Sequence, residues 1–135
     1  MTINEFFKGD KFADFAGVKL LETGNGYAKA SMEIQPMHLN GGGVCQGGAI
    51  FTLADLAFAA ATNSHAQLTF SINSNINFFK SVSKGILYAE AREVFNHKKL
   101  SNCEVTVTNE EGELIATFGG TGFRKEIPLP FPAEE

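Results

Sequence analysis

A glycine-rich loop leads into an apolar stretch that carries a single carboxylate. From Asn40 to Gly48 the chain reads Asn-Gly-Gly-Gly-Val-Cys-Gln-Gly-Gly, and the following residues 49–63 contain one charged side chain, Asp55. This stretch is rich in alanine, lacks proline and is apolar on nearly every side, which predicts a buried helix over 47–62. Because an unpaired buried carboxylate is costly, we expect Asp55 to serve catalysis or binding.

The start of this helix offers hydrogen-bond donors that suit a polarised carbonyl oxygen. The amides of Gln46, Gly47 and Gly48 are free of intrahelical partners, and the helix dipole favours negative charge beside them. Asp55 lies eight residues after Gly47, or about 12 Å along the axis. A base and an oxyanion donor must both lie near ~3 Å from the reacting atoms. Two antiparallel helices in a two-fold dimer can meet this condition, so the sequence predicts an active site across a subunit interface.

Strands account for most of the remaining chain. Alternating residues and the Gly24-Asn25-Gly26 turn predict a hairpin. The expected strands are 18–23, 27–34, 68–78, 86–95, 103–108 and 114–124. In 68–78 the apolar residues are expected to form the buried face of a half-buried strand. Strands set apart from one apolar helix indicate the α+β class, with a curved antiparallel sheet around that helix. We expect one domain over 1–135, with a helical lead at 1–15 and an extended tail at 126–135.

Composition excludes several classes of function. The chain has 135 residues and a net charge of −4, which argues against a nucleic-acid partner. No apolar run approaches the ~18 residues of a membrane span, and the N-terminus lacks a signal peptide, so a cytoplasmic protein is expected. The two cysteines are too few for a disulfide framework. No spacing of His, Cys and Asp fits a zinc site, and no cofactor is expected.

The loop and helix resemble the signature of hotdog-fold acyl-CoA thioesterases of the phenylacetyl-CoA (PaaI-like) type. The matching residues are Asn40 to Gly48 followed by Leu53-Ala54-Asp55, and Ser71 to Gly85 is similar to a later strand of that family. The resemblance implies a hotdog fold and a homodimer that forms the active site, paired into a homotetramer, a dimer of dimers. It also implies metal-free hydrolysis of an acyl-CoA to a free acid and CoA.

The resemblance further implies a role for each residue of the site. Asp55 matches the catalytic carboxylate, either as general base or as nucleophile, and the Gly47 amide matches the donor that polarises the thioester carbonyl. Asn40 matches a loop asparagine that holds the water or the carboxylate, and Ser71 stands where relatives carry a water-positioning hydroxyl. Gln46 replaces the usual histidine; it can donate a hydrogen bond but does not titrate near neutral pH.

Substrate contacts are expected at the helix and after the long strand. The expected substrate-binding residues are Gly48, Phe51, Phe78, Lys80 and Lys84. Aromatic side chains predict an apolar pocket for a small aryl or a medium-chain acyl group. Lysines, together with Arg124 and Lys125, are candidates for the phosphates of CoA, although each is equally a solvated surface charge.

Other interpretations stay open. Asp55 could be a carboxylate capped by the backbone or by Asn63, with a purely structural role. The replacement of histidine by Gln46 favours a non-catalytic acyl-CoA-binding hotdog protein as the main alternative. A hotdog dehydratase is weaker, because it needs a histidine facing the substrate hydroxyl, and no histidine is placed there.

Overall fold

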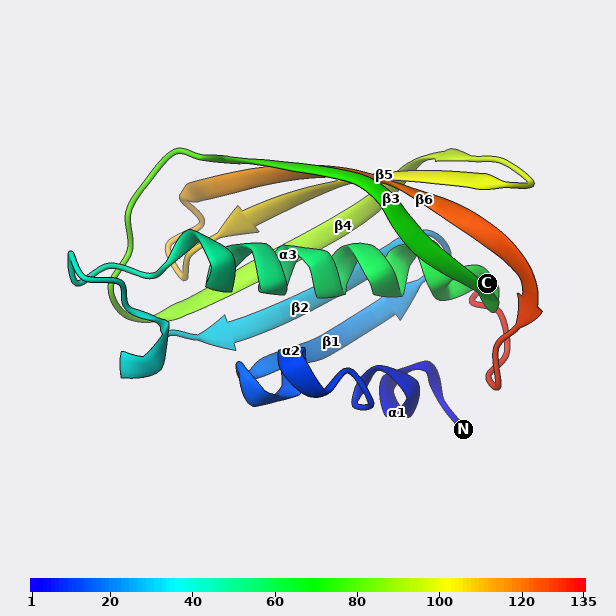
Figure 1. Ribbon diagram of the computed structural model, residues 1–135, viewed down its shortest axis with the longest axis horizontal. Coiled ribbons are helices and arrows are strands. Elements are labelled where there is room, and N and C mark those ends of the chain that lie inside the picture. The colour runs from blue at the N-terminus through cyan, green and yellow to red at the C-terminus, as the bar shows by residue number, and fades with distance from the viewer.

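One six-stranded sheet curves around a single long helix (Figure 1). The computed structural model describes all 135 residues. Its elements are α1 (Ile3–Phe7), α2 (Lys11–Phe15), β1 (Val18–Gly24), β2 (Tyr27–Glu33), η1 (Pro36–His38), α3 (Gly47–Thr62), η2 (Asn63–His65), β3 (Gln67–Phe78), β4 (Ile86–Asn96), β5 (Leu100–Thr108) and β6 (Leu114–Pro128). All neighbouring strands are antiparallel, in the order β1-β2-β4-β5-β6-β3. The predicted α+β class, with a curved antiparallel sheet around the helix 47–62, is confirmed.

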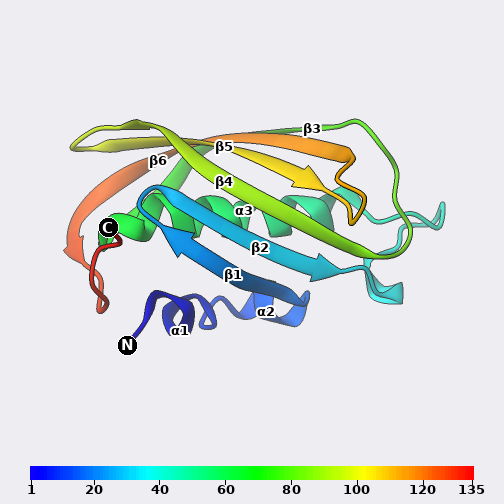
Figure 2. The ribbon, with the colours of Figure 1, turned by 180° about the vertical axis from the view of Figure 1, so that it is seen from behind.

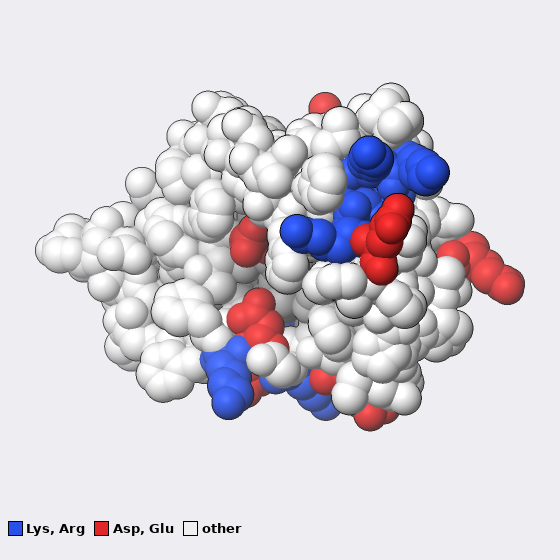
Figure 3. All heavy atoms as spheres, turned by 45° about the vertical axis from the view of Figure 1, so that its right-hand side comes forward, with Lys and Arg blue, Asp and Glu red and all other residues white.

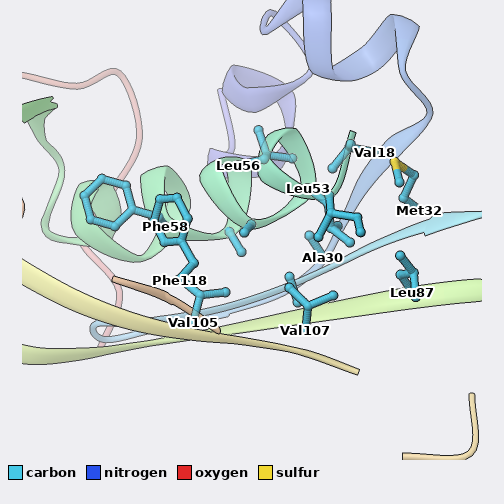
Figure 4. Close-up of a cluster of buried hydrophobic side chains, with 14 of the residues drawn as sticks. Val18, Ala30, Met32, Leu53, Leu56, Phe58, Leu87, Val105, Val107 and Phe118 are labelled. Atoms are coloured by element: carbon cyan, nitrogen blue, oxygen red, sulfur yellow. The ribbon is translucent and has the colours of Figure 1, made fainter. Parts of the chain in front are cut away.

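The core lies between α3 and the concave face of the sheet. Figure 4 shows Leu53 and Phe58 of α3 among side chains from the sheet, and the rings of Phe58 and Phe118 lie 5.8 Å apart. Glycine in β6 permits this close packing, since a Cβ on Gly120 would lie 2.8 Å from a ring carbon of Phe58. The core therefore fixes the rotation of α3 about its own axis.

The prediction that α3 is buried on every side is wrong. Gly48, Thr52, Asp55 and Ala59 are partly or fully exposed, and their spacing places them on one face of the helix. The sheet covers the opposite face, while α1 and α2 lie beside α3 and β1 (Figures 1 and 2). Asp55 therefore lies on the face of α3 that the sheet leaves uncovered.

Strand β3 forms one edge of the sheet and departs from the predicted burial. Phe70 and Ile72 are 55% and 61% exposed, although the sequence predicted that they face the core, whereas Ile76, later in the strand, packs against the core as predicted. The register against β6 shifts between Ser71 and Asn73, which leaves Ile72 as an extra residue. Such a bulge reverses which residues of the strand face inward. The outer edge of β3 pairs with no other strand of the chain.

The segment 126–135, expected as an extended tail, starts as the end of β6 and then folds back. Phe131 is buried, and its ring centroid lies 5.5 Å from that of Phe6 in α1. The Glu134 amide donates to the Ser64 carbonyl at 2.8 Å. These contacts hold the C-terminus against the end of α3. None of the helices combines the length and the apolar character that a bilayer span requires.

Candidate active site

The glycine-rich loop before α3 is held in one conformation by its own asparagine. Asn40 Oδ1 accepts hydrogen bonds from the amides of Gly42 at 2.9 Å and Val44 at 3.3 Å. Gly43 has a φ of +79°, which favours glycine. At the end of the loop, the Gln46 amide donates to the His38 carbonyl at 2.7 Å. Asn40 thus orders the loop through its oxygen, while its Nδ2 amide has no acceptor within the chain.

The first turn of α3 presents two free amides. No acceptor within the chain takes the hydrogens of Gly47 or Gly48, and the Gln46 side chain does not cap the helix. The hydrogen bonds of the helix begin with Ala49 and Ile50, whose amides donate to the Gln46 carbonyl. Free amides at the positive end of the helix dipole form a site for an oxyanion or a polarised carbonyl.

Phe78 lies directly against this helix start. A Cβ on Gly47 would come within 2.9 Å of the Phe78 ring, so the ring and the glycine backbone are in close contact. Both residues line a groove of about 340 Å³. Its lining residues are Val44, Cys45, Gly47, Ile50, Phe78, Phe79, Lys80 and Ser81. Gly47, the expected carbonyl donor, therefore lies in the same groove as Phe78 and Lys80, two of the expected substrate contacts.

Three of the other expected contacts lie outside this groove. The ring of Phe51 packs on the ring of Phe118 at 5.2 Å. Gly48 lies on the exposed stripe of α3, where its Cα faces the Gln46 side chain. Lys84 is exposed in the loop between β3 and β4. Within the groove, Lys80 forms an ion pair with Glu113, and hydrogen bonds from Lys80 and Asn109 lower the pKa of the Glu113 carboxyl.

Asp55 is a half-buried carboxylate without a partner in its own chain. It takes part in no side-chain hydrogen bond or ion pair, whereas the Asn63 side chain binds the backbone of Thr69 and Ala59. Asn63 therefore does not cap Asp55. Burial raises the pKa of the Asp55 carboxyl, and the negative charge of Asp10 raises it further. A higher pKa makes this carboxylate a stronger base.

An apolar groove of about 400 Å³ lies over the C-terminal part of α3, beyond Asp55. Its lining residues are Phe6, Phe7, Gly9, Asp10, Ala59, Asn63, Leu68, Thr69 and Phe70. Sequence reasoning did not place the N-terminal residues here, although the phenylalanines of segment 1–15 were the available signal. Ser71, the next residue of β3, is exposed, and its Oγ lies 2.8 Å from that of Ser74. Asp10 lines this groove, and its charge is one of the two causes that raise the pKa of Asp55.

One chain does not bring the carboxylate to the free amides. Gly47 and Asp55 belong to the same unbroken helix, so about two turns separate them. A second copy of the helix is needed to place both groups at one carbonyl. No group of three or more His, Cys, Asp or Glu side chains is arranged to hold a metal ion.

Comparison with known proteins places this geometry in context. Residues 42–116 match the family model described as "Thioesterase superfamily". A protein of Archaeoglobus fulgidus named "Putative esterase" is 41% identical over 125 residues, which cover 92% of this chain and 81% of that protein. The Escherichia coli protein named acyl-coenzyme A thioesterase PaaI is 29% identical over 119 residues, which cover 87% of this chain and 85% of the E. coli protein.

Solved structures agree with the fold. The structure of E. coli PaaI superposes with a TM-score of 0.89 at 26% identity, over 93% of this chain and 91% of that chain. A Streptococcus mutans protein, described as bound to acetyl CoA, gives a TM-score of 0.78 at 27% identity, over 82% of this chain and 90% of that one. The predicted hotdog fold and the PaaI-like resemblance are confirmed.

Proposed function

Because the chain belongs to the thioesterase superfamily, we propose that it hydrolyses an acyl-CoA thioester to a free acid and CoA. One observation carries the proposal: Asp55 is half-buried, has no partner in its chain and shares a helix with the free Gly47 amide. A base and a carbonyl-polarising donor are the two groups that this hydrolysis needs. The name of the E. coli relative and the acetyl CoA bound to the S. mutans relative support the choice of thioester.

The active site is proposed to form between two copies of the chain. If the α3 helices pack antiparallel, each Asp55 lies beside the Gly47 amide of the other subunit. Two features support this pairing. The exposed stripe of α3 has small residues at Gly48 and Ala59, and the unpaired edge of β3 exposes Phe70 and Ile72. An unpaired strand edge of this length is a template for pairing with another chain. A dimer of such dimers remains the proposed complete assembly.

In the proposed reaction, the Gly47 amide of one subunit donates to the thioester carbonyl oxygen. The Asp55 carboxylate of the other subunit removes a proton from water as the water oxygen attacks the carbonyl carbon. The resulting oxyanion stays hydrogen-bonded to the Gly47 amide until the carbon–sulfur bond breaks. The CoA thiolate then takes the proton from Asp55. In the alternative route, Asp55 attacks the carbonyl carbon and expels the CoA thiolate as the carbon–sulfur bond breaks. Water then hydrolyses the mixed anhydride to the free acid and the Asp55 carboxylate, and the proton released goes to the thiolate. Asn40 and Ser71 are proposed to position the water.

The acyl group is proposed to lie in the groove beside Phe78 at the helix start. Its apolar walls and volume of about 340 Å³ fit a small aryl or a medium-chain group. Gln46 is proposed to donate a hydrogen bond near the thioester without taking part in proton transfer.

Free-thiol release from a panel of thioesters tests the proposal. The panel runs from acetyl-CoA through phenylacetyl-CoA to palmitoyl-CoA, with the purified chain and its Asp55→Asn variant. We expect turnover by the wild type and a loss of roughly 10²-fold to 10⁴-fold in the variant, the usual contribution of a general base. Tight binding of an acyl-CoA without thiol release by the wild type would instead favour the non-catalytic binding protein.

A further inference from the structure

The segment that leads into the first turn of α3 is free of charged residues. Residues 34–54 contain no Asp, Glu, Lys or Arg. In Figure 3 the charged atoms gather toward the right and the lower edge, and the left end of the view, where Figure 1 places this segment, is white. Carboxylates and ammonium groups of its own therefore do not hold the helix start in place. The one buried polar side chain in this segment is His38.

Both ring nitrogens of His38 bind backbone groups. Nδ1 accepts a hydrogen bond from the Gln35 amide at 2.8 Å, and Nε2 donates to the Ala16 carbonyl at 2.7 Å. Because an amide donates and a carbonyl accepts, Nε2 carries the ring hydrogen while Nδ1 keeps its lone pair. The two partners therefore fix one neutral tautomer of a buried imidazole.

The two ring contacts have different reach. Gln35 belongs to the same turn as His38, whose amide also donates to the Gln35 carbonyl at 2.9 Å, so this contact closes η1 on itself. Ala16 is the C-cap of α2, and α2 packs against β1 and α3. The Nε2 contact therefore fixes the position of η1 relative to the rest of the fold.

The backbone of His38 holds the start of α3. Its carbonyl accepts a hydrogen bond from the Gln46 amide at 2.7 Å, next to the bridge between Leu39 and Cys45. Gln46 is the N-cap of α3, and the free amide of Gly47 follows it directly. A shift of His38 therefore moves Gln46, and the Gly47 amide moves with it.

Resting on the proposed thioesterase function, we propose that His38 is a positioning residue. Its Nε2 contact with Ala16 holds the first turn of α3 where the Gly47 amide meets the thioester carbonyl. Misplacing such a donor by about 1 Å costs roughly 10²-fold in rate. A second contact, from the Cys45 amide to the Val82 carbonyl at 2.7 Å, does not depend on the His38 ring. Loss of the ring contact therefore shifts the helix start without releasing the loop.

Two conservative variants separate the ring contacts. The amide nitrogen of glutamine lies as many bonds from Cα as Nε2 of histidine, so His38→Gln keeps the donor to Ala16. The amide oxygen of asparagine corresponds to Nδ1 in the same way, so His38→Asn keeps only the acceptor for Gln35.

Steady-state thiol release compares these variants with the wild type. We expect His38→Asn to lower kcat roughly 10-fold to 10²-fold with KM unchanged, and His38→Gln to keep kcat close to that of the wild type. Val105→Ala, which removes buried methyl groups from β5, should lower the melting temperature and leave kcat unchanged. Unchanged kcat in His38→Asn, or an equal loss in both His38 variants, would overturn the assignment.

Amide hydrogen exchange followed by NMR separates this inference from the proposed function, because it needs no turnover. We expect the Gln46 amide to exchange roughly tenfold faster in His38→Asn than in the wild type, and to stay protected in His38→Gln. NMR of the ring nitrogens should place the hydrogen of wild-type His38 on Nε2. These results support the role of His38 even if the wild type releases no thiol, which would refute the proposed function alone. A ring hydrogen on Nδ1, or equal protection of Gln46 in all three proteins, would overturn it.

Discussion

Substituting Gly47 with proline removes one hydrogen-bond donor and leaves the helix able to form. Proline at the first helical position is well tolerated, because the amide there has no intrahelical acceptor. The preceding residue, Gln46, has φ −64° and ψ 141°, the extended conformation that proline requires before it. The change therefore tests the proposed carbonyl donor at little backbone cost.

The matched control is Gly47→Ala. Any side chain at this position places a Cβ within 2.9 Å of the Phe78 ring, so both variants meet the same contact. Only proline also lacks the amide hydrogen. Loss of one oxyanion donor costs about 10²-fold to 10³-fold in kcat, and we expect this difference between Gly47→Pro and Gly47→Ala in thiol release.

Coexpression of Gly47→Pro with Asp55→Asn then tests the shared site. Random pairing makes half of the dimers mixed, and one of the two sites in each mixed dimer has both wild-type groups. About a quarter of the wild-type activity should therefore return. As a control, Asp55→Asn coexpressed with the Gly47→Pro/Asp55→Asn double variant has no complete site and should stay inactive.

Two results would refute this reasoning. Equal kcat values for the proline and alanine variants would show that the Gly47 amide does not act on the carbonyl. Absence of restored activity in mixed dimers, verified to contain both chains, would show that Asp55 and Gly47 of different subunits do not share a site.

Four further predictions concern the carboxylate, the core and the sheet edge. The pKa of the half-buried Asp55 is raised in the folded protein, so above the pKa of the unfolded chain its ionised form destabilises the fold. Asp55→Asn should therefore raise the melting temperature at pH 7. This gain should vanish in acid, where Asp55 is protonated in both states. Asp10→Asn should move the acid limb of kcat/KM to lower pH, because it removes a charge that raises the pKa of Asp55. Gly120→Ala should lower the unfolding free energy by roughly 1–3 kcal/mol through overpacking against a buried ring, while Gly41→Ala, with open space around it, should be neutral in the same denaturant titration. Ile72→Lys should give a monomer by analytical ultracentrifugation and abolish thiol release, since it charges the β3 edge; an active monomer would contradict the interface.

The sequence predicted the helix and the hairpin because local signals decide them. The helix extends from Gly47 to Thr62 as expected, since glycines and a polar loop mark its start and an unbroken apolar run follows. Gly26 in the first hairpin has a φ of +64°, the conformation that an Asn-Gly turn favours. The alternation around Val105 in β5 matches its burial. These elements are encoded by neighbouring residues.

Long-range contacts decided what the sequence could not predict. The bulge at Ile72 depends on the register against β6, so residue alternation alone gave the wrong buried face to part of β3. The open stripe of α3 depends on how much of the helix the sheet covers. The charge of Asp10, which lies between α1 and α2, raises the pKa of Asp55 on α3. Lys98 and Lys125, far apart in the chain, line the same groove. In each case the partner is distant in the chain.

The placement of the functional groups has a consequence for kinetics. The groups proposed to react, Gly47 and Asp55, both lie on α3, and the packing of Phe58 against β6 fixes the rotation of this helix. In the proposed reaction, the hydrogen bond to the oxyanion and the proton transfer to the carboxylate develop in the transition state. Loss of an interaction made only in the transition state lowers kcat and leaves substrate binding intact. Variants of Gly47 and Asp55 should therefore lower kcat far more than they raise KM.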